Sequence, residues 1–510
     1  MSSSDYFDEM FRDQVYGPRD GMQPREWQVK CMESYLVSIE GWSQPAPHVF
    51  CVYAGTGSGK TKAAGMIVAA MLNSGKVDQV VIVCPNKSIR NKTKKEFLRY
   101  FGVELAIFHK QRHGDGIPRM QQGYILTYSA LMQDPTLHRR LCKASRTLVI
   151  FDEVHHLGDS NGWGNGAEES FGGVPFVIAL TGTPYRSDNT RIPFVCYEET
   201  ERNGILRFKP NYTYSLGRAV ADGVCRKPLF HFHDGKVSIR LGLGAGEITA
   251  DFSDHKVNQT ISSLRLLGAV KYGSTDRRGM LRDALQKCRD EKRKAIIFLG
   301  GDTQGDETPT QDATTCLPAE LQELGYGPED YDIVTGDDGG AQAKIEAFGA
   351  HETKWILISI NMVSEGTDIP ELSAAIFLTS ITAKQTTVQR IGRSLRLMGE
   401  SDQHKDALIF MFADKDLIEL ADEMDDEIKC EINLQRKKRE AGGEGESERE
   451  RRTRAEAIGI GEGNLRMVKF HGREWPAEVI DRAKRKLRDK GLPQTMLNAV
   501  LQLLDSEGKI

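Results

Sequence analysis

The segment AGTGSGKT, from Ala54 to Thr61, limits the possible folds of this chain more than any other stretch. It follows the apolar run HVFCVY and precedes TKAAGMIVAAMLNSG, which has helical spacing. In such a strand–loop–helix unit, glycines let backbone N–H groups converge on phosphate oxygens, and the helix N-terminus adds positive potential. The alternative, a glycine-rich turn beside an unrelated lysine, rarely has this spacing and context.

This loop predicts a site for ATP and Mg²⁺. We expect Lys60 to reach the β and γ phosphates and the Thr61 hydroxyl to bind Mg²⁺. The residues expected to surround the phosphates are Gly55, Thr56, Gly57, Ser58 and Gly59.

The stretch LVIFDEVHHL, from Leu148 to Leu157, places two carboxylates directly after an apolar run. Neighbouring carboxylates repel each other unless a cation or a proton lies between them. Beside a phosphate loop, we expect Asp152 to hold the Mg²⁺, directly or through water, and Glu153 to orient and deprotonate the attacking water. The alternative is a solvated pair at a strand end, which is common when such a pair stands alone.

Short apolar runs recur along the chain, first between residues 48 and 182 and again between residues 294 and 413. Near-continuous apolar strands that alternate with helical segments indicate doubly wound parallel α/β sheets. Between the two groups, LFHFHDGKVSIRL is strand-like and RRGMLRDALQKCRDEKR is helical. We predict a tail at 1–20, a first α/β domain at 21–207, a second at 208–414, and a charged linker with a helical extension at 415–510.

The composition narrows the class of protein. The formal net charge is -4, so a nucleic-acid partner would need a locally basic surface. Nine cysteines without a CxxC pair are typical of reduced thiols in a cytosolic protein. No run of about 18 apolar residues exists, so we expect no membrane span and a cytoplasmic location.

Five motifs together resemble those of superfamily 2 helicases. They are AGTGSGKT, DEVH at 152–155, TGTP at 181–184, SEGTDIP at 364–370 and QRIGRSLR at 389–396, in the order and spacing of that family. The resemblance covers roughly residues 20 to 415 and is nearest to the DExH group, which includes the motor subunits of type III restriction enzymes and similar bacterial and phage DNA helicases. It implies two tandem RecA-like domains followed by the C-terminal extension.

The resemblance also implies roles for single residues. Gln28 resembles the glutamine that recognises the adenine edge; alternatively, it is a surface helix residue. Thr181 and Thr183 match the motif that couples the ATP site to nucleic-acid movement. Residues implied on the nucleotide side of the second domain are Gly366 and Asp368, together with Gln389 and the arginine fingers Arg393 and Arg396.

The nucleic-acid contacts are assigned by the same resemblance. Asn86 and Lys87 follow an apolar run as the first nucleic-acid motif does, and Thr127 matches a second such loop. Polar strand-to-helix loops without this role have the same pattern. Trp163 is expected to be an anchored or mobile loop residue, the alternative being a residue that stacks on a base or wedges a duplex.

The leading functional prediction is an ATP-dependent DNA helicase, expected to act as a monomer. A double-stranded DNA translocase and an RNA helicase are alternatives within the same enzyme class. A clamp with a degenerate ATP site is disfavoured because Lys60, Glu153 and Arg393 are all present. No nuclease motif is recognisable, so in restriction, repair or defence a protein partner would have to supply cleavage. The C-terminal helices are expected to dock such a partner or to contact DNA.

Overall fold

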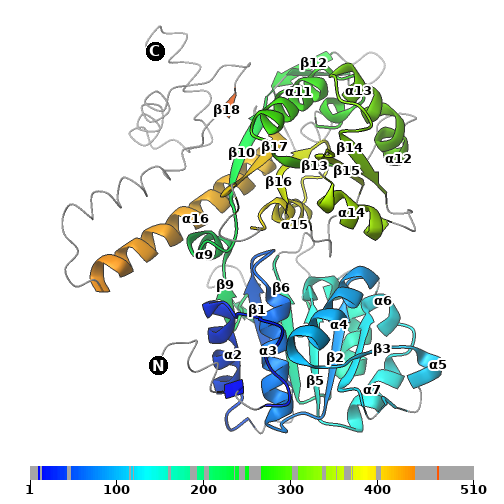
Figure 1. The fold of residues 1–510 in the computed structure, drawn as a ribbon, viewed down its shortest axis with the longest axis vertical. Coiled ribbons are helices and arrows are strands. Elements are labelled where there is room, and N and C mark those ends of the chain that lie inside the picture. The colour runs from blue at the N-terminus through cyan, green and yellow to red at the C-terminus, as the bar shows by residue number, and fades with distance from the viewer. Residues whose placement is uncertain are drawn as a thin grey trace. The chain divides into compact units, whose positions relative to one another are not determined.

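The chain forms two compact units in a computed structural model (Figure 1). The first unit comprises residues 1–225, 362–370 and 383–397, and the second comprises 226–361, 371–382 and 398–510. The structure describes residues 10–11, 14–42, 47–113, 116–118, 120–158, 162–183, 192–199, 206–234, 236–240, 247–251, 266–300, 308–335, 341–351, 353–360, 369, 371–397, 402, 404–442 and 468–469.

The first unit is built on a seven-stranded parallel sheet of order β3-β4-β2-β5-β6-β1-β9. The central strands are largely apolar and buried, as expected where helices cover both faces. Their bounds are β1 (His48–Ala54), β2 (Gln79–Cys84), β3 (Ala106–Ile107), β4 (Gly123–Thr127), β5 (Thr147–Asp152), β6 (Phe176–Thr181) and β9 (Tyr212–Tyr214).

Helices α3 and α4 lie against this sheet (Figure 1). A small antiparallel pair, β7 (Tyr197–Glu199) and β8 (Leu206–Phe208), completes the strands of the unit. The helices are α2 (Glu26–Ser38), α3 (Lys60–Asn73), α4 (Lys87–Phe101), α5 (Lys110–His113), α6 (Tyr128–Leu131), α7 (Pro135–Lys143), α8 (Trp163–Phe171), α9 (Leu216–Ala221) and α15 (Lys384–Ser394), with a 3₁₀ turn at Val154–Gly158.

The second unit has its own seven-stranded parallel sheet, of order β14-β15-β13-β16-β17-β10-β18. The strands are β10 (Lys227–His233), β13 (Lys294–Leu299), β14 (Tyr331–Val334), β15 (Ile356–Ile360), β16 (Leu372–Phe377), β17 (Asp406–Phe412) and β18 (Val468–Lys469). The antiparallel pair β11 (Lys236–Arg240) and β12 (Glu247–Asp251) forms a separate sheet. The helices are α11 (Thr275–Asp290), α12 (Pro309–Gln311), α13 (Leu317–Glu323), α14 (Ala341–Ala350) and α16 (Lys415–Gly442), with a π-helical turn at Asp312–Cys316.

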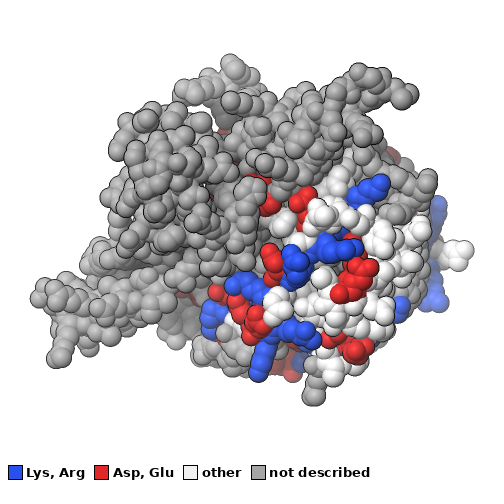
Figure 2. Space-filling view, turned by 90° about the horizontal axis from the view of Figure 1, so that it is seen from above, with Lys and Arg blue, Asp and Glu red and all other residues white. Residues whose placement is uncertain are grey.

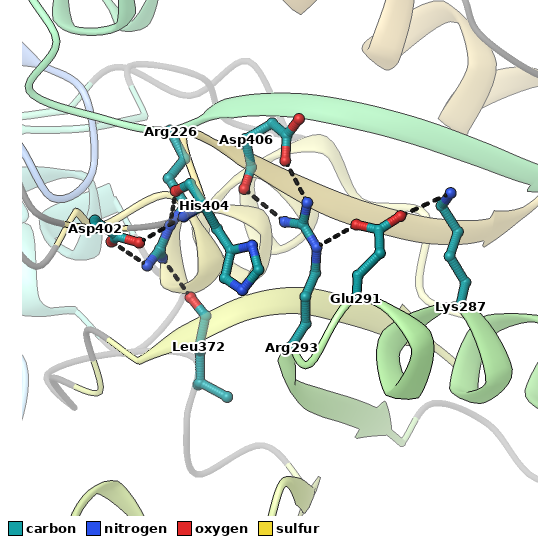
Figure 3. A network of polar contacts seen from close by, with 8 residues as sticks. All are labelled: Arg226, Lys287, Glu291, Arg293, Leu372, Asp402, His404 and Asp406. Carbon is teal, nitrogen blue, oxygen red and sulfur yellow. Dashed lines mark hydrogen bonds and ion pairs between the residues drawn. The ribbon is translucent and has the colours of Figure 1, made fainter.

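Two buried arginines tie the ends of strands together in the second unit (Figure 3). Arg226 donates to the Asp402 carboxylate at 2.6 Å and to two main-chain carbonyls, and it is 1% exposed. Arg293 donates to Asp406 at 2.6 Å and to Glu291 at 2.7 Å. These bonds hold the residues just before β10 and β17 in place, and so fix where the two strands begin.

The two predicted sheets are confirmed. Each predicted apolar run forms a strand, the helix predicted around residues 277–293 is α11, and LFHFHDGKVSIRL forms β10 and β11. The predicted boundary at 207/208 falls ahead of β9, which pairs with β1 because the chain returns to the first sheet before it enters the second unit at residue 226. Residues 383–397, which we assigned to the second domain, belong to the first compact unit.

The C-terminal region begins with α16, whose buried side chains recur at helical spacing at Leu417, Leu420, Met424 and Ile428. The two helices predicted near the C-terminus, and most of the tail at 1–20, lie outside the described residues. On the face shown in Figure 2, Lys and Arg side chains are interleaved with Asp and Glu. Within the described part of the chain, no helix has the length and apolar character needed to cross a bilayer.

Candidate active site

Three predicted motifs meet at one edge of the first sheet. Strands β5, β6 and β1 are adjacent and parallel, so the loops that follow them share the carboxyl edge. These loops carry DEVH, TGT and the phosphate loop. Ligands of open α/β sheets bind at this edge, and the fold therefore brings the first-domain motifs together.

The phosphate loop requires glycine at two positions. Gly57 has φ 84° and Gly59 has φ 97°, a region that side chains with a Cβ rarely adopt. A Cβ at Gly59 would also lie 2.7 Å from Gln28 Nε2. Ser58 is fully buried, and its hydroxyl has no hydrogen-bond partner among the described residues.

Lys60 and Glu153 form an ion pair at the centre of the site. Lys60 Nζ lies 3.0 Å from Glu153 Oε1 and donates to the Ala54 carbonyl at 3.2 Å. The main-chain N–H of Gly182 donates to Glu153 Oε2 at 3.2 Å. A Cβ at Gly182 would lie 2.7 Å from Lys60 Nζ, so the TGT loop approaches the lysine at a distance that only glycine permits.

Glu153 has an unusual backbone conformation. Its φ is 52°, in the left-handed region, which costs a non-glycine residue about 1–3 kcal/mol. Burial by itself would raise the pKa of Glu153, but Lys60, His155 and the Gly182 N–H outweigh it and lower the pKa. The carboxylate is therefore held charged and aimed at Lys60.

His155 is the functional residue that our sequence analysis missed. It is 2% exposed, and its Nδ1 lies 3.2 Å from Thr181 Oγ1 and 3.5 Å from Thr183 Oγ1. Its Nε2 lies 3.2 Å from Gln389 Nε2. Both ring nitrogens of His155 therefore lie within hydrogen-bond distance of polar side chains of the site. The sequence signal that could have identified His155 was its place as the last residue of the DEVH motif.

Helix α15 brings its predicted residues to the phosphate loop within the first unit. Arg396 forms an isolated β-bridge with Cys225, and a Cβ at Gly57 would lie 3.1 Å from Arg396 Cγ. A Cβ at Gly392 would lie 2.6 Å from Thr56, so this glycine permits the close approach of the helix. Arg393 is 6% exposed.

Gln28 is buried against the phosphate loop rather than on a surface helix. Its Nε2 donates to the Gly59 carbonyl at 3.0 Å, and its Oε1 accepts from Arg25 N at 2.9 Å. Arg25 Nη1 donates to the Ser58 carbonyl at 2.6 Å. The contact with Gly59 fixes the position of Gln28 beside the loop, while its role toward adenine stays a prediction.

The predicted nucleic-acid residues occupy helix starts. Asn86 Oδ1 accepts from Ile89 N at 3.0 Å and caps α4, of which Lys87 is the first residue. Thr127 Oγ1 accepts from Ala130 N at 3.2 Å and caps α6. Trp163 stacks on Tyr128 with a ring-centroid distance of 5.7 Å, as an anchored residue would. Gly366 and Asp368 lie outside the described residues.

The residues present fit a nucleotide with Mg²⁺. The two left-handed glycines leave the loop open to phosphate oxygens, and the buried Ser58 hydroxyl has a donor available for one of them. Thr61 lies in the first turn of α3, and Asp152 ends β5 with 8% exposure. A hydroxyl and a carboxylate, with phosphate oxygens, are the ligands that Mg²⁺ takes in such sites.

Two regions of the chain match known protein families. Residues 21–186 match the res subunit of type III restriction enzymes, and residues 278–398 match the helicase conserved C-terminal domain. Together the two matches support a superfamily 2 helicase of a family similar to the motors of type III restriction enzymes. As predicted, its two parallel sheets are tandem RecA-like domains.

Individual relatives agree with this assignment. An uncharacterized protein of Mycobacterium leprae (strain TN) is 31% identical over 410 residues, which are 80% of this chain and 64% of the relative. An uncharacterized protein of Mycobacterium tuberculosis (strain ATCC 25618 / H37Rv) is 30% identical over 417 residues, 82% of this chain and 65% of the relative. The chain thus spans slightly less than two thirds of the length of these relatives.

Among solved structures, a fragment of a putative HsdR subunit of a type I restriction enzyme from Vibrio vulnificus YJ016 has the same fold. The TM-score is 0.53 at 17% identity, and the match covers 81% of this chain and 68% of the fragment. The ATP-dependent type ISP restriction-modification enzyme LlaBIII bound to DNA has a TM-score of 0.50 at 13% identity, with 77% of this chain and 28% of that chain covered.

Proposed function

We propose that the chain is an ATP-dependent DNA motor of the DExH type, which couples hydrolysis of Mg-ATP to movement along DNA. The observation that carries the proposal is the His155 cluster. It joins Glu153, the expected base, to Thr181 and Gln389 through contacts of 3.2 to 3.6 Å. Hydrolysis alone does not require that Glu153, the TGT loop and α15 be connected, whereas coupling of hydrolysis to movement does.

The ion pair of Lys60 and Glu153 defines how the base is controlled. Lys60 binds Glu153 at 3.0 Å, and the same Nζ is the group that would bind the β and γ phosphates. When Lys60 turns to phosphate, Glu153 loses its strongest positive neighbour while burial still raises its pKa. With nucleotide bound, Glu153 is thus released from Lys60, and it orients and deprotonates the attacking water.

Other groups would neutralise the negative charge of the bound phosphates. Mg²⁺, when bound by Thr61 and Asp152, supplies neutralisation of phosphate charge. Arg393 on α15 and Arg396, two residues after the end of that helix, are the arginine-finger candidates, and such a finger typically contributes ~10³–10⁵ in rate. Gln389 on the same helix contacts His155, so a shift of α15 reaches the base and the TGT loop together.

DNA is the proposed track for two reasons. The first half of the chain matches a restriction-enzyme motor subunit, and restriction enzymes act on DNA. Helix α4 also begins with Lys87 and contains Arg90, Lys92, Lys94 and Lys95, a local basic surface on a chain of net charge -4. We further propose that the motor works as a monomer and that residues after Gly442 dock a protein partner.

The test is steady-state ATP hydrolysis by the full chain, alone and with single-stranded DNA, duplex DNA or single-stranded RNA. We expect DNA to stimulate hydrolysis and Glu153→Gln to lower it by about 10²–10⁴. Stimulation by duplex DNA without strand separation would indicate a translocase, and stimulation by RNA alone would replace DNA as the track. Equal rates in wild type and Glu153→Gln would refute the assignment of the base.

A further inference from the structure

Tyr128 reaches from one functional loop to another inside the first unit. It is the first residue of α6, directly after Thr127, and is fully buried. Its hydroxyl donates to the main-chain carbonyl of Asp152 at 2.9 Å. Strand β2 lies between β4 and β5, so the tyrosine spans the width of one strand to make this bond.

The bonded carbonyl belongs to the peptide unit that precedes Glu153. Because a peptide unit is planar, the orientation of this carbonyl and the N–H of Glu153 change together, and with them φ of Glu153. That φ is 52°, a conformation that a glutamate keeps only when its surroundings hold it. Lys60 and Gly182 hold the carboxylate end, and the Tyr128 hydroxyl holds the backbone end.

The ring of Tyr128 is itself fixed by stacking. Trp163 lies parallel to it, at 5.7 Å and 8° between planes, and Phe151 lies at 6.4 Å and 9°. A ring packed against two parallel aromatic rings transmits a movement of α6 to its hydroxyl instead of absorbing it by rotation. This packing gives Trp163 a role behind the catalytic acid.

The other end of the connection is the cap of α6. Thr127 Oγ1 accepts from Ala130 N and lies 3.0 Å from Ser129 Oγ, so this loop and the first turn of α6 form one hydrogen-bonded unit. Thr127 is a candidate for contact with the nucleic-acid backbone. The Tyr128 side chain therefore links this loop directly to the peptide unit of Glu153.

We propose that Tyr128 is a positioning residue through which bound nucleic acid sets the backbone of the catalytic Glu153. This inference rests on the proposed function, because it needs hydrolysis that responds to nucleic acid. It gives the loop at Thr127 a direct connection to Glu153 that is separate from the connection through α15 and His155.

The test is Tyr128→Phe, which removes the hydroxyl and keeps the stacked ring. We expect the ratio of DNA-stimulated to basal kcat to fall about fivefold to tenfold, the size of one buried hydrogen bond, while KM for ATP and DNA affinity stay near wild type. The matched control is Tyr124→Phe. Tyr124 is equally buried on β4, but its hydroxyl bonds His138 at 3.0 Å and does not touch the DEVH loop.

The outcomes separate the two proposals. A wild-type chain that DNA does not stimulate would refute the proposed function and this inference together. A stimulated wild type with an unchanged ratio in Tyr128→Phe would refute only the inference. An equal fall of the ratio in Tyr124→Phe would also refute it, because the loss would then follow from any missing hydroxyl in the core.

Discussion

Two of the buried ion-pair centres among the described residues differ in design, one in each unit. In the second unit, Arg277 is 1% exposed and donates to Glu320 at 2.7 Å, to Asp312 at 2.7 and 2.9 Å, and to the Val270 carbonyl at 2.7 Å. In the first unit, Lys60 has Glu153 and one carbonyl, and the Glu153 side chain is 17% exposed on a strained backbone. The Arg277 centre has its bonding groups occupied by protein partners, whereas the Lys60–Glu153 centre can still bind another ligand.

The difference shows how to recognise function in buried charge. A closed centre such as Arg277 has every group bonded by elements that pack around it, so it fixes one structure. An open centre such as Lys60 and Glu153 stands at the carboxyl edge of a sheet, carries backbone strain, and has a partner that a phosphate would replace. Burial alone does not distinguish the two.

The largest effect that this comparison predicts is on stability. Arg277→Met would leave Glu320, which is 1% exposed, and Asp312 without their cation and lower the free energy of unfolding by about 3–5 kcal/mol. Urea or thermal unfolding, followed by probes of the second unit, measures it. Glu153→Gln is the reciprocal variant: it should lower ATP hydrolysis by about 10²–10⁴. Its loss of stability should be smaller than that of Arg277→Met, because Lys60 keeps its bond to the Ala54 carbonyl.

A second substitution tests whether the loss of stability in Arg277→Met comes from the carboxylate left without its cation. Adding Glu320→Leu to Arg277→Met removes the stranded carboxylate, and part of the lost stability should return. If the double variant is less stable than Arg277→Met alone, the uncompensated charge is not the cause.

A third way to bury a titratable group is to keep it neutral, as the first unit does with His138. Its side chain is fully buried, and burial lowers its pKa from 6.5 to about 4, against a smaller opposing effect of Asp134. Between pH 6.5 and 4 the unfolded chain therefore binds a proton that the native chain excludes. Stability falls as pH falls through this window, by about 3 kcal/mol at pH 4.

His138→Phe isolates this contribution. The ring lies among Phe108, Tyr124 and Phe171, so phenylalanine keeps the aromatic packing while removing the proton site. Loss of the Tyr124 bond shifts stability equally at all pH values. We expect a flatter pH profile of unfolding below pH 6.5, and the same slope in variant and wild type would contradict the assignment.

The sequence predicted what depends on local pattern. Apolar runs and their spacing located the long strands of both sheets but not the short edge strands β3, β9 and β18. The phosphate loop and the acid pair indicated residues that the fold places at one carboxyl edge. His155 was missed because its partners, Thr181 at the end of β6 and Gln389 on α15, are distant from it in sequence. Arg226 and Arg277 gave no signal, since a charged residue in a helical or loop pattern is expected at the surface until packing shows otherwise.

The smallest effect comes from the neighbour of Arg277, which provides a matched control on the same helix. Arg278 lies 3.1 Å from Glu323, but the two side chains are 44% and 56% exposed. Water and salt screen such a pair, and ordering two long side chains offsets its attraction. Arg278→Met should therefore change the free energy of unfolding by less than about 1 kcal/mol, and by even less in high salt. Both variants delete one arginine from α11 and one bond toward α13, so a similar loss in both would mean that charge removal on this helix, and not enclosure of Arg277, sets the stability of the second unit.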